Sequence, residues 1–203
     1  NGKQANHLVL LAENERGFAN LVRLVSKAHL DGYYYKPRID RRLLAEHAEG
    51  LIGLSACLKG EVAEALKDGL EDKARQLAAE YAEILGKDHF YLEVQDHGLP
   101  EQRDVNRQMV ALARQLKLPL VATNDVHYLE REHVEAHEML LCLQTQAKWS
   151  ETDRMKYGSD QFYLKSEAEM RKLFGDLPEA IENTWKIAER CNVELELGGQ
   201  KNP

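Results

Sequence analysis

The stretch Val121-Ala-Thr-Asn-Asp-Val-His-Tyr128 carries the most information about the fold. Together with Leu118-Pro119-Leu120 it begins as a short, continuous apolar run, which is typical of a strand buried in a parallel sheet. Asp125 and His127 follow two residues apart, and in an extended chain such residues point to the same side. A carboxylate and an imidazole could then bind one metal ion where the strand ends. The alternative is that Asp125 caps a turn and His127 is a surface residue.

Apolar runs and helical patterns alternate along the rest of the chain. We expect strands at residues 7–12, 50–56, 89–95 and 119–123, and helices at residues 14–27, 43–48, 60–67, 72–85, 100–116, 132–144, 166–174 and 178–191. Asn14 is the expected N-cap of the first helix, and Gly86 ends the fourth. This alternation predicts an α/β fold with a parallel sheet, as a barrel or a doubly wound stack. Four strands are too few to close a typical barrel, so we expect part of the domain upstream of Asn1.

Composition limits the classes of protein that fit. The chain has 203 residues, with 27 basic and 34 acidic side chains and a formal net charge of −7, which argues against general polyanion binding. Its three cysteines, Cys57, Cys142 and Cys191, are too few and too scattered for a disulfide framework. No signal peptide and no apolar run near the roughly 20 residues of a membrane span are present. We therefore expect a soluble cytoplasmic protein with no membrane partner.

Other predicted strand ends also carry polar groups. Cys57 follows the strand of residues 50–56 and could ligate zinc as a thiolate, or be a small buried hydrophobic residue. His7 opens the first strand and could equally be a polar junction residue. Glu93 and His97, at and after the third strand, could join a site or form a hydrogen-bonded turn. His7, Cys57, Asp125 and His127 together predict a site for zinc, with manganese or iron as alternatives.

The segment Tyr33-Tyr-Tyr-Lys-Pro-Arg-Ile-Asp-Arg-Arg42 mixes aromatic and basic side chains. Such a mixture can stack on bases and pair with phosphates, so Lys36 and Arg38 are candidate nucleic-acid contacts. The alternative is a solvated loop whose tyrosine rings pack on the wall of the domain.

Several of these motifs, in this order and spacing, resemble the PHP (polymerase and histidinol phosphatase) domain of bacterial replicative DNA polymerase III alpha subunits. The resemblance covers nearly the whole chain. The residues that carry it are Tyr35-Lys-Pro-Arg-Ile-Asp40, Gly50-Leu-Ile-Gly-Leu-Ser-Ala-Cys-Leu-Lys-Gly60, Phe90-Tyr-Leu-Glu-Val-Gln-Asp-His-Gly-Leu-Pro100, Val121-Ala-Thr-Asn-Asp-Val-His-Tyr128, Ala136-His-Glu138 and Ala188-Glu-Arg-Cys-Asn-Val193.

The resemblance implies a distorted (β/α)7 barrel of the PHP type, with the N-terminal part of the barrel absent from this chain. Residues 1–165 would be the C-terminal portion of the barrel, and residues 166–203 a helical segment leading towards the polymerase palm. The family binds two or three divalent metals with up to nine ligands, and His7, Cys57, Asp125 and His127 fall on four ligand positions. The family's first ligands, which include a His-x-His pair, would precede Asn1, and no His-x-His occurs in this chain.

As part of such a subunit, the chain would serve bacterial DNA replication with DNA, a sliding clamp, a clamp loader and a proofreading exonuclease as partners. The whole subunit would be a DNA-directed DNA polymerase, but the polymerase active site lies outside this chain. The chain itself could carry only metal-dependent phosphoesterase chemistry, expected as 3′–5′ proofreading. Asp125 and His127 would act at the catalytic metal, and Glu93, His97 and His137 would orient ligands. His137 could instead be a core histidine.

The alternative function is a non-catalytic, metal-stabilised module that docks a separate proofreading exonuclease. Retention of the ligands distinguishes the enzyme from a module that has lost its metal, because such a module has no reason to keep a thiol, a carboxylate and two imidazoles together. A structural metal without hydrolysis stays open. All four visible positions hold competent ligands, which favours metal binding.

Overall fold

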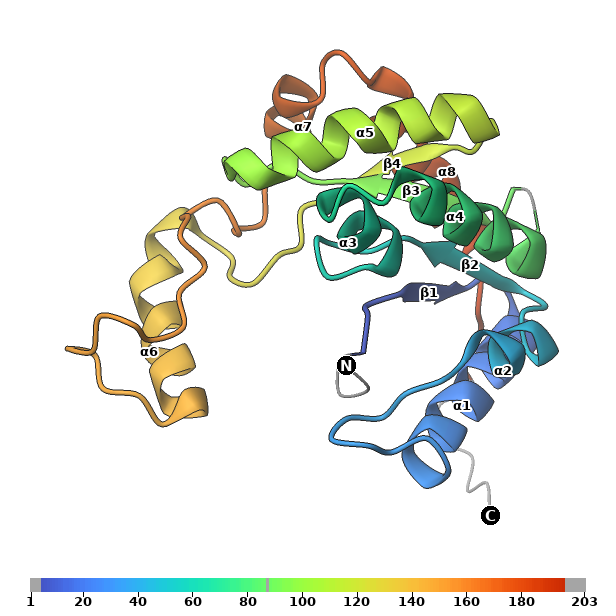
Figure 1. The fold of residues 1–203 in the computed structure, drawn as a ribbon, viewed down its shortest axis with the longest axis horizontal. Helices are drawn as coiled ribbons and strands as arrows, with labels where there is room; N and C mark the ends of the chain where they lie inside the picture. Colours follow the sequence, from blue (N-terminus) through green and yellow to red (C-terminus); the bar gives the residue numbers. More distant parts are fainter. Residues whose placement is uncertain (1–4, 87, 196–203) are drawn as a thin grey trace.

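The computed structural model describes residues 5–86 and 88–195, and its centre is a four-stranded sheet in the order β1-β2-β3-β4 (Figure 1). The strands are β1 (Val9–Ala12), β2 (Leu51–Leu54), β3 (Phe90–Val94) and β4 (Leu120–Ala122). The helices are α1 (Glu15–Leu30), α2 (Arg41–Glu46), α3 (Glu61–Lys67), α4 (Glu71–Leu85), α5 (Pro100–Leu116), α6 (Val134–Thr145), α7 (Glu167–Leu173) and α8 (Pro178–Arg190), with a 3-10 turn η1 (Arg131–His133) before α6. The α/β class and every predicted element are confirmed, while barrel closure stays an expectation.

The sheet is not wholly parallel, which corrects the prediction. β2, β3 and β4 run parallel, but β1 pairs with β2 in the antiparallel direction, with Ala12 opposite Leu51. The reason lies in the connection: α1 leaves the end of β1, and the loop of residues 31–40 and α2 bring the chain back beside it. Gly17 and Gly50 touch at this return, where a Cβ on Gly17 would lie 1.8 Å from the Gly50 carbonyl oxygen. β2 therefore starts where β1 ends.

Local signals explain the helix ends. The Asn14 side chain accepts a hydrogen bond from the Gly17 N–H at 3.0 Å and caps α1, as predicted. Asp40 caps α2 in the same way, accepting from the Leu43 N–H at 2.8 Å. Gly86 follows α4 with φ +97°, a conformation that favours glycine. Asn14 and Asp40 thus set where α1 and α2 begin, and Gly86 sets where α4 ends.

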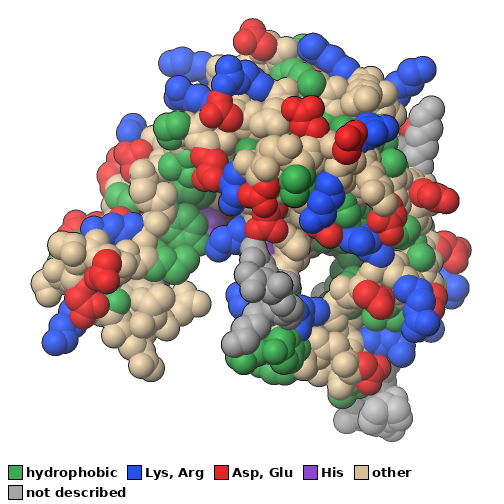
Figure 2. Space-filling model, viewed as in Figure 1, with side chains coloured by type: hydrophobic (Ala, Val, Ile, Leu, Met, Phe, Trp, Pro, Cys, Tyr) green, Lys and Arg blue, Asp and Glu red, His purple; other side chains and the backbone are tan. Residues whose placement is uncertain are grey.

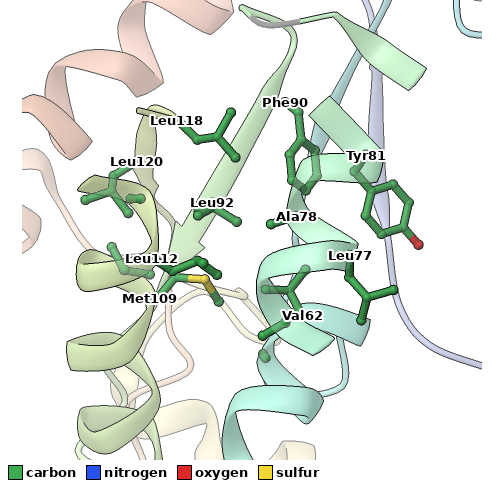
Figure 3. Packing of buried hydrophobic residues seen from close by; sticks show 14 of the residues in the cluster. Val62, Leu77, Ala78, Tyr81, Phe90, Leu92, Met109, Leu112, Leu118 and Leu120 are labelled. Atoms are coloured by element: carbon green, nitrogen blue, oxygen red, sulfur yellow. The ribbon is translucent and has the colours of Figure 1, made fainter. Parts of the chain in front are cut away.

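The main core lies between the sheet and the helices α3, α4 and α5. Alternate residues of the strands point to this face, and Phe90 and Leu92 of β3 pack against Val62, Ala78 and Met109 (Figure 3). Each fully buried large apolar side chain contributes about 1.5–3 kcal/mol to stability relative to exposure.

The opposite face of the sheet carries a smaller cluster. Ile52, Leu54, Tyr91 and Val121 meet Ile187 of α8 there. α8 also contacts β4, where the Asn183 side-chain amide donates to the Leu120 carbonyl oxygen at 2.7 Å. Residues 166–195 thus contribute to the packing of the sheet; the domain boundary predicted at residue 166 stays a prediction, and residues 196–203 lie outside the described part.

α6 and the segment that follows it lie to one side of the sheet (Figure 1). They are joined to the end of β4 by backbone hydrogen bonds from the His127 N–H to the Phe162 carbonyl at 2.8 Å and from the Leu164 N–H to the Tyr128 carbonyl at 3.1 Å. Within the described ranges, no helix combines the length and hydropathy that a membrane span requires.

Candidate metal centre

The antiparallel direction of β1 brings His7 to Cys57. The start of β1 lies at the same end of the sheet as the carboxyl end of β2, and the His7 N–H donates to the Lys59 carbonyl at 2.9 Å. His7 Nδ1 lies 3.6 Å from the Cys57 Sγ. Two of the four predicted ligands are therefore in contact, although they lie 50 residues apart in the sequence.

A tight turn holds Cys57 at the end of β2. Ala56 has φ +65°, a left-handed conformation that is costly for a residue with a side chain. The turn closes through a hydrogen bond from the Gly60 N–H to the Cys57 carbonyl at 2.8 Å. A Cβ on Gly60 would lie 2.0 Å from the Ser55 carbonyl oxygen, so only glycine fits there.

Glu93 fixes this turn from the neighbouring strand. Its buried carboxylate accepts hydrogen bonds from the Ala56 N–H at 2.8 Å, from the Gln95 side-chain amide at 3.0 Å and from the Thr123 hydroxyl. Burial raises the pKa of Glu93, while these donors oppose the rise. Glu93 thus acts on the backbone beside a ligand, and no contact to a ligand imidazole is formed among the described residues.

Asp125 and His127 do not lie on an extended strand, which corrects the argument from their spacing. β4 ends at Ala122, and Asp125 has φ +43°, so the alternation of side chains along a strand does not reach these residues. The chain turns here because His127 Nδ1 makes a hydrogen bond with the Asp125 carbonyl at 2.7 Å. The other ring nitrogen, Nε2, lies 2.9 Å from the Tyr157 hydroxyl.

Electrostatic effects connect Cys57 with Asp125 across the sheet. Burial is the main cause of the raised pKa of the Cys57 thiol, and the charges of Asp125 and Glu93 raise it further. The pKa of Tyr157 is raised by burial and then by Asp125 and Cys57. Cys57, Asp125 and Tyr157 therefore form one electrostatic neighbourhood at the end of the sheet.

His97 is completely buried and both of its ring nitrogens have partners. Nε2 lies 2.7 Å from the Asn124 carbonyl, Nδ1 lies 2.8 Å from the Gln102 amide nitrogen, and the ring stacks on Phe162 at 3.9 Å. Because a carbonyl only accepts, Nε2 carries the proton and donates. Burial lowers the pKa of His97, which keeps the ring neutral. It fixes the backbone immediately before Asp125.

His137 and Tyr157 belong to an aromatic cluster around His127. The ring of His137 lies 5.6 Å from that of His127 and 5.2 Å from that of Tyr157. Burial and the nearby His127 lower the pKa of His137. We did not predict Tyr157, because it lies in an irregular segment whose only local signal is the turn residue Gly158.

The described residues bring two of the four predicted ligands into contact. His7 and Cys57 offer a nitrogen and a sulfur, a donor pair that suits zinc, and the charge of Asp125 raises the pKa of the Cys57 thiol. The buried Gln95 Oε1 has no hydrogen-bond partner among the described residues, so one more oxygen is left at this end of the sheet. Within residues 5–86 and 88–195, however, no three His, Cys, Asp or Glu side chains are grouped closely enough to hold an ion.

The loop of residues 31–40 presents its aromatic and basic side chains to solvent. The three tyrosines Tyr33, Tyr34 and Tyr35 are exposed, and the Arg38 guanidinium lies 4.7 Å from the centre of the Tyr34 ring. Lys36 is exposed and Arg38 lines a groove of about 1020 Å³ beside β1. On the face seen in Figure 2, basic and acidic side chains are interspersed.

Comparison with known proteins shows which proteins the chain is similar to. A PHP domain family model matches residues 1–97. DNA polymerase III subunit alpha of Treponema pallidum is 46% identical over 202 residues, which is 100% of this chain and 17% of that protein. The subunits of Deinococcus radiodurans and Thermus aquaticus are 45% and 44% identical, over 96% and 95% of this chain and 15% and 16% of their own lengths. The chain thus spans about one sixth of the relatives it matches. Residues 1–97 thus match the PHP domain family, and nearly the whole chain is similar to DNA polymerase III alpha subunits.

Proposed function

We propose that this chain is the metal-binding PHP region of a bacterial replicative DNA polymerase and that it hydrolyses phosphodiesters, as a 3′–5′ proofreading exonuclease. The observation that carries the proposal is the 3.6 Å contact between His7 Nδ1 and Cys57 Sγ, at the same end of the sheet as Asp125. A histidine nitrogen and a cysteine sulfur in contact are a donor pair that zinc sites use, and Asp125 would add a carboxylate.

Each residue has a role in this proposal. His7 and Cys57 would hold a divalent ion, zinc first, with manganese or iron as alternatives, and Asp125 would balance its charge. Such an ion supplies Lewis-acid polarisation of a phosphoryl oxygen when it is bound. His127 joins the ligands only after its Nε2 is released from Tyr157. Up to three ions would bind in the complete domain.

The chain spans only about one sixth of the length of its relatives, so its place within a DNA polymerase is itself part of the proposal. In the complete subunit it would act on DNA at the replication fork, beside a sliding clamp, a clamp loader and other replisome proteins. Lys36 and Arg38 would guide the DNA strand, since exposed aromatic and basic side chains can stack on bases and pair with phosphates. DNA synthesis itself would belong to the palm domain.

The test uses the full-length subunit, with Asp125→Asn and the control Asp176→Asn, an exposed acid after α7. Metal content by elemental analysis and release of 3′ nucleotides from primed DNA are measured on each protein, with DNA synthesis as the control for folding. We expect metal content and nucleotide release to fall only in Asp125→Asn. Metal-free wild-type protein, or equal release from both variants, would contradict the proposal.

A second function has its own support. Both ring nitrogens of His127 are occupied by protein groups, and the described residues contain no complete ligand group. These observations favour a non-catalytic module that docks a separate proofreading exonuclease. Wild-type protein that contains metal but releases no nucleotide, and that co-elutes with the exonuclease, would select this function.

A further inference from the structure

Tyr157 lies against the one nitrogen of His127 that a metal could use. His127 Nδ1 faces the Asp125 carbonyl at 2.7 Å, and a carbonyl oxygen can only accept a hydrogen bond. Nδ1 must therefore carry the ring proton. In the neutral ring this leaves the lone pair on Nε2, and the Tyr157 hydroxyl donates to it at 2.9 Å.

The surroundings of Tyr157 place its ring against His127. The ring packs 4.5 Å from His127 and 4.9 Å from Phe162. Its pKa is raised by burial and by the charges of Asp125 and Cys57, so the side chain lies in the field of two further candidate ligands. The Tyr157 hydroxyl therefore occupies the lone pair of His127 Nε2 that a metal ion would need.

The segment that carries Tyr157 has no regular secondary structure. Residues 146–166 form neither helix nor strand, apart from a single bridge at Tyr163. Displacement of the Tyr157 hydroxyl from His127 would therefore break no hydrogen bond of a helix or of the four-stranded sheet.

From this geometry we propose that Tyr157 is a displaceable cap on His127: its hydroxyl holds the ring with Nε2 towards the site while no metal is bound, and a metal must displace it to bind. This inference rests on the proposed function, because it concerns access to the same metal site. Tyr157 is a positioning residue in this scheme. It competes with the metal for a single lone pair.

The test compares Tyr157→Phe with Tyr163→Phe in the full-length subunit. Phenylalanine keeps the ring packing and removes only the competing hydroxyl. Tyr163 is a matched control, since it lies in the same segment and its hydroxyl donates to Glu169 at 2.6 Å, away from His127. Mn²⁺ binding is measured by calorimetry, and the ¹⁵N shifts of the His127 ring are measured without metal.

We expect Tyr157→Phe to bind Mn²⁺ about 2- to 10-fold more tightly than wild type, the affinity change that one hydrogen bond corresponds to. The His127 Nε2 resonance should shift in metal-free Tyr157→Phe, and Tyr163→Phe should match wild type in both measurements. Equal or weaker binding by Tyr157→Phe would overturn the inference while leaving the proposed metal site standing. Absence of Mn²⁺ binding in all three proteins would reject the metal site and the cap with it.

Discussion

The Glu93 carboxylate accepts a hydrogen bond from the Ala56 N–H at 2.8 Å, across from β3 to the turn after β2. Ala56 is left-handed and precedes Cys57, so a buried charge on one strand stabilises the strained backbone that presents the thiol of another. The ends of two parallel strands are thereby tied together at the proposed metal site.

Replacing Glu93 with glutamine should lower the free energy of unfolding by about 1–3 kcal/mol. The new amide nitrogen donates and cannot accept, so at least one of the donors on Ala56, Gln95 and Thr123 loses its partner. Urea unfolding of the two proteins at neutral pH measures the difference. The matched control is Glu83→Gln, an exposed residue of α4, which should change stability by less than about 0.5 kcal/mol. Equal stability of Glu93→Gln and wild type would show that the hydrogen bonds to Glu93 contribute nothing.

The buried, neutral His97 predicts a loss of stability on acidification. Burial lowers its pKa in the folded protein below the ordinary value of 6.5, so the unfolded chain binds a proton first as the pH falls. The contribution of His97 is complete above pH 6.5 and is lost as the pH drops from there through the folded-state pKa. His97→Gln should therefore lose less stability than wild type on acidification, while remaining less stable at neutral pH.

Unfolding in urea at a series of pH values measures this slope. His29→Gln, which changes an exposed histidine at the end of α1, should keep the wild-type slope. His137 contributes in the same direction, because its pKa is also lowered, and it is unchanged in both variants. The account of His97 is wrong if His97→Gln and wild type lose stability in parallel.

Charge reversal of Lys36 and Arg38 should weaken DNA cleavage by the full-length subunit several-fold without changing its metal content. Both residues lie on a loop with exposed tyrosines, and neither is one of the candidate ligands. The effect should be largest at low salt, where phosphate contacts contribute most. Lys172→Glu on α7 serves as the control for a general change of charge. Unchanged cleavage by Lys36→Glu and Arg38→Glu at low salt would exclude this loop as a DNA contact.

The sequence predicted the elements well because their ends are encoded locally. Asn14 and Asp40 cap their helices through their own side chains, and Gly86 ends α4. The direction of β1 is different, since a four-residue apolar strand has the same pattern in either direction. It depends on the contact between Gly17 and Gly50, which no local pattern shows.

The site could be predicted only as a set of residue types. The ends of the predicted strands indicated Cys57 and the neighbourhood of Asp125. The argument from the spacing of Asp125 and His127 required an extended backbone, which the structure does not have at Asp125. The contact of His127 Nε2 with Tyr157 joins residues 30 positions apart, and no local pattern in the sequence marks Asp125 as left-handed. Glu93 and His97 make hydrogen bonds to the backbone beside Cys57 and Asp125, and their role in orienting ligands stays a prediction.

Cobalt binding tests the central claim, that His7 and Cys57 together hold a metal, most directly. Co²⁺ bound to a thiolate gives a charge-transfer band in the near ultraviolet, so titration of the full-length subunit reports a cysteine ligand without any assay of activity. We predict a band in wild type that is absent in Cys57→Ser, weaker in His7→Gln and unchanged in Cys191→Ser. A band that persists in Cys57→Ser, or no band in wild type, would contradict the account.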